Sequence, residues 1–407
     1  MNKVVITSFA RTPVGRFLGG LKEVPVERLA TIAVEEAINR SSISKKDIEG
    51  VVFGHVISSA DVANIGRYVA LDSGLDETCV GMSVNRICGS GIQAIINAAL
   101  EIKTGHGDIM IAGGAESLSR VPYYLPLPVR YEGMKNGNGN LLCSNEEYAK
   151  NTAPLHRYPA IESMGITGEN IVEKYGIKRE EQDLFAYNSQ MKAKNAIESG
   201  RMAKEIIPVE IINKKGTVLI DKDEHPRMDT TIEALSKLRP VFKKNGTITA
   251  GSSSGMNDAG AACVLMSERK CMELGLKPLA FVEDYDVHGV DPTIMGMGPV
   301  GAINKLLKRS NLTLEDIGLL EINEAFAGQV LGCCKELGNY LGTKLHDRLN
   351  VNGGAIAFGH PLGMTGTRLA GTLAYEFQER DCKYGIASAC TGGGMGVALL
   401  LRNPNCL

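Results

Sequence analysis

A cysteine stands where a predicted strand gives way to a predicted helix. Cys88 lies in the segment 85–91, Asn-Arg-Ile-Cys-Gly-Ser-Gly, and an apolar stretch with helical periodicity follows over 91–100. The N–H groups and the dipole at a helix start stabilise a thiolate, so the position predicts a nucleophile. The flanking glycines leave room for a bulky thioester. A buried structural cysteine at a tight turn is the alternative interpretation.

A histidine occupies the corresponding turn later in the chain. His360 lies in the segment 353–366, Gly-Gly-Ala-Ile-Ala-Phe-Gly-His-Pro-Leu-Gly-Met-Thr-Gly. A histidine that faces a cysteine can take its proton and create the ion pair that attacks a thioester. The alternative is a histidine that only satisfies hydrogen bonds within a loop.

Two further segments place polar groups at the ends of apolar strands. Cys390 opens the segment 390–396, Cys-Thr-Gly-Gly-Gly-Met-Gly, whose glycines permit close backbone approach and leave N–H groups for a developing oxyanion. A second thiol there could carry protons, although core packing is an equal alternative. Asn323 and Glu324 follow the strand predicted over 319–322, at the carboxyl end where open α/β sheets usually bind ligands. Asn323 could orient a water or an oxyanion, whereas Glu324 could be catalytic or structural.

The elements that must position these residues occur twice along the chain. Residues 40–48 and 309–317 match position for position, each after a helix-like stretch and before a strand-like one. Three pairs of predicted elements follow: strands at 51–53 and 319–322, helices at 91–100 and 367–375, and strands at 108–112 and 384–388. Between the first and second pairs, Val84-Asn85 is repeated as Val351-Asn352. This alternation predicts an α/β fold with mixed, buried sheets covered by helices. The pseudo-symmetry would bring the Cys88 and His360 turns together.

A loop-rich region separates the two halves. Pro122, Pro126 and Pro128 interrupt regular structure near its beginning, and two helices are predicted inside it at about 166–176 and 179–199. The sequence therefore predicts a first half from 1–118 plus about 251–270, an inserted loop domain at 119–250, and a second half at 271–407. Long insertions of this kind commonly carry binding function.

Composition narrows the classes of protein. The chain has 407 residues, 44% of them hydrophobic and 22% charged, with a formal net charge of −2. This charge balance gives no broad positive surface potential, so binding to nucleic acid or anionic lipid is not expected. No apolar run reaches the roughly 18 residues of a membrane span, and the N-terminus does not read as a signal peptide, so we expect a cytoplasmic protein. The ten cysteines form no Cys-x-x-Cys pair and are expected to be free thiols, with no metal site.

These segments together resemble the thiolase family over nearly the whole chain. The resemblance also includes the segments 10–15, 113–117, 164–167 and 295–299. It implies a duplicated thiolase fold of five layers, α-β-α-β-α, with an inserted loop domain that covers coenzyme A. It further implies a homodimer or homotetramer, acyl-CoA and CoA as partners, and no cofactor, because coenzyme A thioesters are the substrates.

The resemblance also implies roles for individual residues. Cys88 is similar to the acylated nucleophile, His360 to its activating base, and Cys390 to the acid/base that acts on the α-carbon of the substrate. Asn323 resembles the residue that holds a water in one oxyanion hole, where His360 is the other donor. The second hole would use the N–H groups of Cys88 and Gly392, and Ser254 resembles the serine near the pantetheine of coenzyme A.

Two positions depart from the family pattern. Ser252 stands where the family usually has asparagine, although Ser254 matches, so we expect coenzyme A binding to be kept. For substrate length, Ser163 stands where short-chain members often have histidine, whereas Gly89 and the segment 295–299 resemble the short-chain members. We predict a short-chain enzyme that interconverts two acetyl-CoA with acetoacetyl-CoA and CoA. The alternatives are a broader-chain degradative 3-oxoacyl-CoA thiolase and a non-catalytic, thiolase-like lipid-binding protein. A condensing enzyme that depends on a carrier protein is disfavoured by the second cysteine, Cys390.

Overall fold

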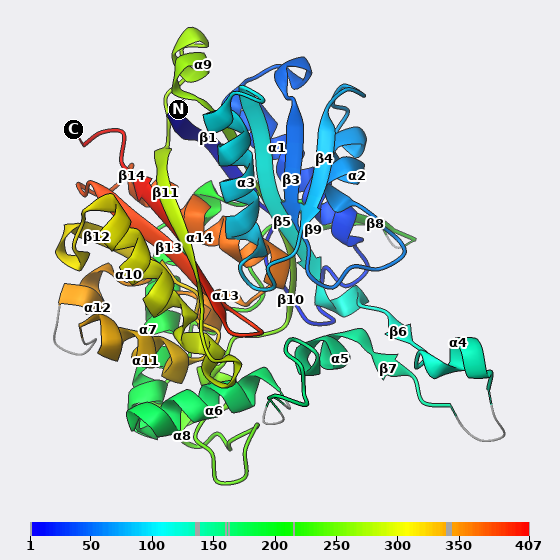
Figure 1. The fold of residues 1–407 in the computed structure, drawn as a ribbon, viewed down its shortest axis with the longest axis vertical. Coiled ribbons are helices and arrows are strands. Elements are labelled where there is room, and N and C mark those ends of the chain that lie inside the picture. Colours follow the sequence, from blue (N-terminus) through cyan, green and yellow to red (C-terminus); the bar gives the residue numbers. More distant parts are fainter. Residues whose placement is uncertain are drawn as a thin grey trace.

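The computed structural model describes residues 2–134, 139–158, 161, 163–214, 216–338 and 344–406. Figure 1 shows two α/β halves side by side, the first in blue and cyan and the second in yellow to red, with the insertion in green along one end of both. Among the described residues, no helix combines the length and the apolar character needed to cross a bilayer.

Ten of the described strands form one mixed sheet. The first half contributes β4 (Val80–Val84), β3 (Gly50–Gly54), β5 (Ile109–Ser117), β10 (Asn257–Ser267), β1 (Val4–Arg11) and the short β2 (Gly15–Arg16). The second half contributes β11 (Ala280–Gly289), β14 (Met395–Arg402), β13 (Tyr384–Thr391) and β12 (Ile317–Ile322). The order is β4-β3-β5-β10-β1 and then β11-β14-β13-β12, with β2 beside β10. Strands β1 and β11 join the halves through three antiparallel residue pairs, from Val4–Val282 to Ile6–Ala280.

Helices cover both faces of each half and make five layers. Helices α1 (Val26–Ser41) and α2 (Ile65–Asp72) pack outside the first half, while α10 (Gly298–Ser310) and α11 (Ala327–Leu337) pack outside the second. Helices α3 (Ser90–Thr104) and α14 (Leu362–Glu376) lie between the two halves, in one buried cluster with side chains of β5 and β14. The strands are buried on both sides, which explains their continuous apolar runs. The expected α-β-α-β-α layering is confirmed.

The sequence repeat corresponds to a structural repeat. Ser42 and Asn311 end α1 and α10 with left-handed conformations, at φ values of 55° and 53°. Short 3₁₀ turns follow at Lys45–Asp47 and Leu314–Asp316, before β3 and β12. Residues 351–352, the echo of Val84-Asn85, form a turn just after the equivalent edge of the second half. A single bridge between Leu320 and Leu349 occupies the equivalent edge.

The insertion between β5 and β10 holds short elements and the two predicted helices. They are β6 (Tyr123–Tyr124), α4 (Pro128–Glu132), β7 (Leu142–Cys143), α5 (Ser144–Lys150), α6 (Met164–Tyr175), α7 (Arg179–Glu198), β8 (Val209–Asn213), β9 (Gly216–Ile220) and α8 (Ile232–Ser236). Strands β6 and β7 and helix α4 form an arm that extends away from the body (Figure 1). The remaining short helices are α9 (Glu268–Glu273), α12 (Lys344–Arg348) and α13 (Ala355–Phe358).

A buried ionic network ties the insertion to both halves. Arg11 on β1 pairs with Glu205 at 2.9 Å and with Asp223 at 2.7 Å. Arg201 pairs with the same Glu205 at 2.9 Å and with Glu376 on α14 at 2.5 Å. Charges buried in this way persist only when they are paired, so the network fixes the start of the loop 221–227 against the core.

Candidate active site

The turn that carries Cys88 is tightly folded just before α3. Ile87 has φ of 48°, which is a strained conformation for a β-branched residue. Its N–H donates to Asn85 Oδ1 at 2.9 Å, and its carbonyl accepts from Ser90 Oγ at 2.6 Å. The Ser90 hydroxyl also accepts from the N–H of Arg86 at 2.9 Å. These bonds hold the Cys88 side chain at the N-terminus of α3.

Glycines let the two central helices approach backbone to backbone. A Cβ on Gly91 would lie 2.5 Å from the Thr367 nitrogen, and a Cβ on Gly366 would lie 2.4 Å from the Ile92 nitrogen. A Cβ on Gly89 would meet Val397 Cγ1 at 2.7 Å and Thr391 Cγ2 at 2.9 Å. The starts of α3 and α14 therefore converge, which brings the Cys88 turn to the His360 turn as the repeat predicted.

Hydrogen bonds assign the tautomer of His360. The Thr365 hydroxyl lies 2.9 Å from the Pro361 carbonyl, to which it donates its only proton. It lies 2.7 Å from His360 Nδ1, so it must accept a proton that Nδ1 carries. His360 Nε2 is then the unprotonated nitrogen, and the Asn323 amide donates to it at 3.3 Å. The imidazole is thus neutral, and the Nε2 lone pair that accepts from Asn323 is the site to which a proton from Cys88 would move.

Asn257 and Asn323 complete the surroundings of His360. The backbone N–H of His360 donates to Asn257 Oδ1 at 3.0 Å, and Asn257 Nδ2 donates to the Gly15 carbonyl at 2.8 Å. Asn323 is fully buried, and its N–H donates to the Ser388 carbonyl at 2.9 Å. Its Oδ1 is buried and has no hydrogen-bond partner within the described part of the chain. A buried acceptor of this kind indicates a bound water or substrate group.

The Cys88 thiol is neutral at rest. Burial raises its pKa to about 11, and the backbone N–H groups of Gly392 and of Cys88 itself only partly oppose that rise. The N–H groups at the helix start lower the pKa, as the sequence predicted, but the loss of solvent raises it by more. Burial, with a smaller effect of Arg368, lowers the pKa of His360 to about 3. A neutral thiol thus faces a neutral imidazole, and the ion pair must form as substrate reacts.

Cys390 and Gly392 lie behind Cys88. Cys390 is fully buried near the end of β13, opposite Gly396 on β14. Burial raises the pKa of its thiol far above the ordinary value, and the neighbouring Cys88 raises it further. The Gly392 N–H reaches the sulfur of Cys88, as described above. The structure therefore brings Cys88, His360, Asn323, Cys390 and Gly392 to one place.

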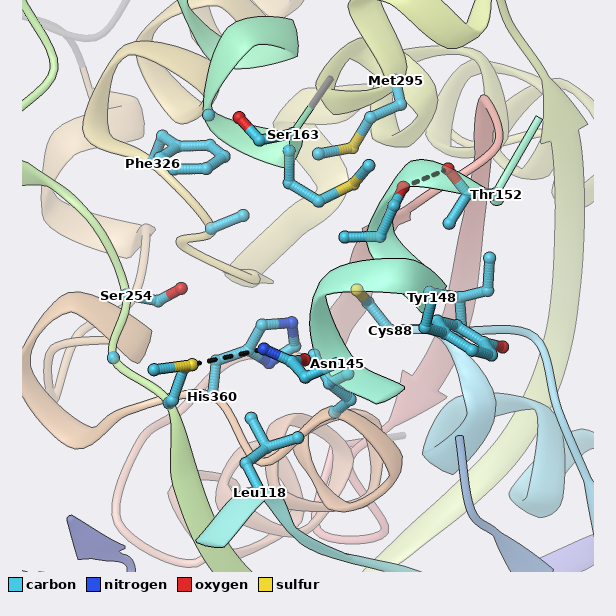
Figure 2. A pocket seen from close by; sticks show the side chains of 18 of the residues that line it. Cys88, Leu118, Asn145, Tyr148, Thr152, Ser163, Ser254, Met295, Phe326 and His360 are labelled. Atoms are coloured by element: carbon cyan, nitrogen blue, oxygen red, sulfur yellow. Dashed lines mark hydrogen bonds between the residues drawn. The ribbon is translucent and has the colours of Figure 1, made fainter. Parts of the chain in front are cut away.

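A pocket of about 260 Å³ opens over Cys88 and His360. Figure 2 shows both side chains pointing into it, with Ser254 on one side of Cys88 and Tyr148 on the other. The walls are mostly apolar and come from both halves and from the insertion. They include Leu118, Met164, Phe242, Met256, Met295, Phe326 and Leu362. Ser163, at the start of α6, also lines the pocket.

Two of the residues considered in the sequence are structural. Ser252 is fully buried, and its Oγ accepts from the Thr249 N–H at 2.9 Å, so it does not line the pocket. Glu324 is buried and accepts from Ser189 at 2.7 Å, from Asn350 at 2.8 Å and from the Ile356 N–H at 3.1 Å. Glu324 therefore anchors the segment before His360 and does not reach the pocket.

Three residues near the reactive groups were not predicted from the sequence. Thr365 and Asn257 hold His360, and Tyr148 lines the pocket beside Cys88. Thr365 lies inside the segment 353–366 that contains His360, and Asn257 lies three residues after Ser254, but neither residue type by itself indicates a contact with His360. Among the described residues, no group of three or more His, Cys, Asp or Glu side chains is arranged to hold a metal ion.

Comparison with known proteins agrees with this arrangement. The family model for the thiolase N-terminal domain matches residues 4–269, and the model for the thiolase C-terminal domain matches residues 276–403. An acetyl-CoA acetyltransferase of Syntrophomonas wolfei is 45% identical over 98% of this chain and 99% of its own length.

Solved structures give the same result. The crystal structure of an acetyl-CoA acetyltransferase of Bacillus anthracis is 43% identical, with a TM-score of 0.93 and coverage of 99% of each chain. Human mitochondrial 3-ketoacyl-CoA thiolase in complex with CoA is 37% identical, with a TM-score of 0.91 over 99% of this chain and 98% of that one. The protein described here therefore belongs to the thiolase family.

Proposed function

We propose that this protein is an acetyl-CoA C-acyltransferase that forms and cleaves short-chain 3-oxoacyl-CoA through a thioester on Cys88. The observation that carries the proposal is the Cys88 thiol, which shares one pocket with a neutral His360 and has the Gly392 N–H at its sulfur. The names of the relatives, acetyl-CoA acetyltransferase in both bacteria, support the same activity.

In the cleavage direction, the first half-reaction forms the acyl-enzyme. The Cys88 proton moves to His360 Nε2 as the sulfur attacks the 3-oxo carbon of acetoacetyl-CoA. The bond between C2 and C3 then breaks, its electron pair stays on C2 as the acetyl-CoA enolate, and Cys390 protonates that carbon. The N–H groups of Cys88 and Gly392 would hold the oxyanion on the attacked carbon. The protonated His360, with a water on Asn323 Oδ1, would hold the enolate oxygen.

The second half-reaction transfers the acyl group to coenzyme A. The CoA thiol gives its proton to the Cys390 thiolate, and its sulfur attacks the acyl carbon on Cys88. The Cys88 sulfur leaves and recovers its proton from His360, so both thiols and the imidazole return to their resting forms. Condensation of two acetyl-CoA is the same sequence in reverse. This chemistry uses only side chains and backbone N–H groups of the protein, a water, CoA and its thioesters, so we propose that no cofactor takes part.

Coenzyme A would enter from the side of the pocket that carries Ser254. A second pocket of about 290 Å³ lies along the segment 250–251 and is lined by His225, Arg227 and Leu238, among others. A coenzyme A molecule that extends from Arg227 past Ser254 to Cys88 would have its anionic nucleotide near the Arg227 guanidinium and its pantetheine in the apolar pocket. The human thiolase described above was solved in complex with CoA, which supports CoA binding here.

We further propose a homodimer or homotetramer that resides in the cytoplasm and serves acyl-CoA and fatty acid metabolism. The arm exposes apolar side chains that a second copy could cover, with Leu127 at 74% and Tyr131 at 75% exposure. All ten cysteines are free thiols, as a reducing compartment favours. Light scattering of the purified protein would test the oligomeric state, where a monomer at micromolar concentration would contradict it.

The two cysteines provide the test of mechanism. Cys88→Ala should abolish both acyl transfer and thiolysis of acetoacetyl-CoA. Cys390→Ala should still acquire an acetyl group from acetyl-CoA but should lose hydrogen exchange at the acetyl methyl group, because that step needs the Cys390 base. Undiminished methyl exchange in Cys390→Ala would remove Cys390 from the mechanism.

Substrate length separates this proposal from its closest rival. We expect kcat/KM for acetoacetyl-CoA to exceed that for 3-oxohexanoyl-CoA and 3-oxooctanoyl-CoA. If either longer substrate is preferred tenfold or more, the broader 3-oxoacyl-CoA thiolase is the correct assignment. Absence of thiolysis with every substrate, in protein that is folded, would instead favour the non-catalytic lipid-binding alternative.

A further inference from the structure

One wall of the pocket comes from a single aromatic side chain of the insertion. Tyr148 lies on α5, and the pocket also touches Asn145, Ala149 and Thr152 on or just after that helix. Figure 2 shows Tyr148 and Ser254 on opposite sides of Cys88. If the pantetheine comes past Ser254, the acyl group that extends beyond Cys88 points toward Tyr148.

The Tyr148 ring is attached to the turn that carries the nucleophile. Its hydroxyl accepts from Asn85 Nδ2 at 2.9 Å and lies 3.3 Å from Asn85 Oδ1. The same Asn85 Oδ1 accepts from the Ile87 N–H, and Nδ2 also donates to the Val56 carbonyl at 3.0 Å. Because Asn85 bonds both to the Tyr148 hydroxyl and to the Ile87 N–H beside Cys88, the ring keeps a fixed position relative to Cys88.

The space behind the ring is apolar. Tyr148 packs with Ile87 and Leu362 against a small cluster made of the buried side chains Val56, Ile57 and Leu118. Removal of the ring would therefore open a cavity lined mainly by hydrocarbon, with the Asn85 amide at the former position of the hydroxyl. Methylene groups fill the hydrocarbon part favourably.

We propose that Tyr148 is the specificity-determining residue that ends the acyl pocket and restricts the enzyme to short, linear acyl groups. This inference rests on the thiolase activity proposed above and adds which side chain limits the substrate. An acetyl group on Cys88 fits in front of the ring, whereas a butyryl or hexanoyl tail meets it. Each additional methylene in an apolar pocket that admits it contributes roughly 10–200-fold to discrimination.

The test compares chain-length preference in a graded set of variants. Tyr148→Ala should raise the ratio of kcat/KM for 3-oxohexanoyl-CoA over acetoacetyl-CoA by at least about tenfold relative to the parent protein. Tyr148→Phe keeps the ring and loses only the Asn85 contact, so the ratio should change by less than about threefold. Glu146→Ala alters an exposed side chain on the same helix and should leave the ratio unchanged.

The outcomes separate this inference from the proposed function. If the parent protein cleaves acetoacetyl-CoA and Tyr148→Ala does so with an unchanged ratio, Tyr148 does not limit the chain and the inference is overturned. If no variant and no parent protein cleaves any 3-oxoacyl-CoA, the proposed function itself fails. Thermal unfolding shows whether each variant is folded. Tyr148→Leu, which keeps a smaller apolar side chain, should give a ratio of kcat/KM between those of the parent protein and Tyr148→Ala.

Discussion

The turns before α3 and α14 occupy equivalent places in the two halves but are built differently. The Cys88 turn is held by its own residues, with Ile87 at a φ of 48°, bonds to the side chains of Asn85 and Ser90, and N–H groups directed at the sulfur. The His360 turn is held by side chains from elsewhere, Asn257 from the first half and Asn323 from the second, together with Thr365 from its own helix. Duplication therefore places the two turns, and a different set of neighbouring groups holds the reactive side chain in each.

The largest effect should follow from removal of the base. His360→Ala would delete both the proton acceptor and one oxyanion donor, so we expect kcat for acetoacetyl-CoA thiolysis to fall on the order of 10⁴-fold. His106→Ala, on an exposed histidine, is the matched control and should be neutral. If kcat falls less than tenfold in His360→Ala, His360 is not the base that activates Cys88.

The pH dependence of alkylation should reveal the resting state of Cys88. Burial raises its pKa to about 11, which favours the neutral thiol, so the thiolate fraction should rise about tenfold for each pH unit below that value. Inactivation by iodoacetamide without substrate should accelerate by roughly three orders of magnitude between pH 7 and pH 10. A plateau near neutral pH would show a preformed thiolate–imidazolium pair and would contradict the neutral assignment.

Thr365 offers a smaller change on the His360 side. Thr365→Val removes the hydroxyl that accepts the Nδ1 proton and leaves a buried donor unpaired, at a cost of about 1–3 kcal/mol. Steady-state kinetics should show kcat reduced about 5–150-fold, with KM changed little, because the tautomer matters for reaction more than for binding. Thr365→Ser should restore most of the rate. Equal activity of the valine and serine variants would remove Thr365 as a positioning residue.

The contact between the helix starts should appear mainly in stability. Gly366→Ala would place a Cβ 2.4 Å from the Ile92 nitrogen, and overpacking of this kind typically costs about 1–3 kcal/mol. Gly289→Ala is the control, because a Cβ there meets nothing within 4 Å. Thermal unfolding should show a lower midpoint for Gly366→Ala alone. Equal midpoints would mean that the two turns are not held together by close backbone contact.

The sequence predicted the parts of this site that depend on order along the chain. The repeat placed Cys88 and His360 at equivalent turns, and the strand ends placed Asn323 and Cys390, so their convergence was foreseeable. The residue boundaries of the inserted domain remain a prediction. Asn257 and Tyr148 were missed because their roles depend on contacts across distant segments, such as the bond between Asn85 and Tyr148. Thr365 is close to His360 in sequence, but its residue type alone does not indicate a bond to the imidazole. The echo of Val84 at Val351 marks the same edge of the sheet, where a single bridge from Leu320 to Leu349 replaces a full strand.

Charge states were also beyond the sequence. A cysteine before a helix indicates a stabilised thiolate, yet the depth of the site reverses the shift, and depth is a property of the whole fold. The need for glycine at position 89 likewise depends on Val397 and Thr391, which come from the other half.

The location of the acyl group tests the central claim most directly. The protein would be incubated with acetyl-CoA, digested at low pH and examined by peptide mass spectrometry. We predict a single acetyl group on the peptide that contains Cys88, removed when CoA is added. An acetyl group on Cys390 or on any other cysteine, with Cys88 unmodified, would contradict the assignment of Cys88 as the nucleophile.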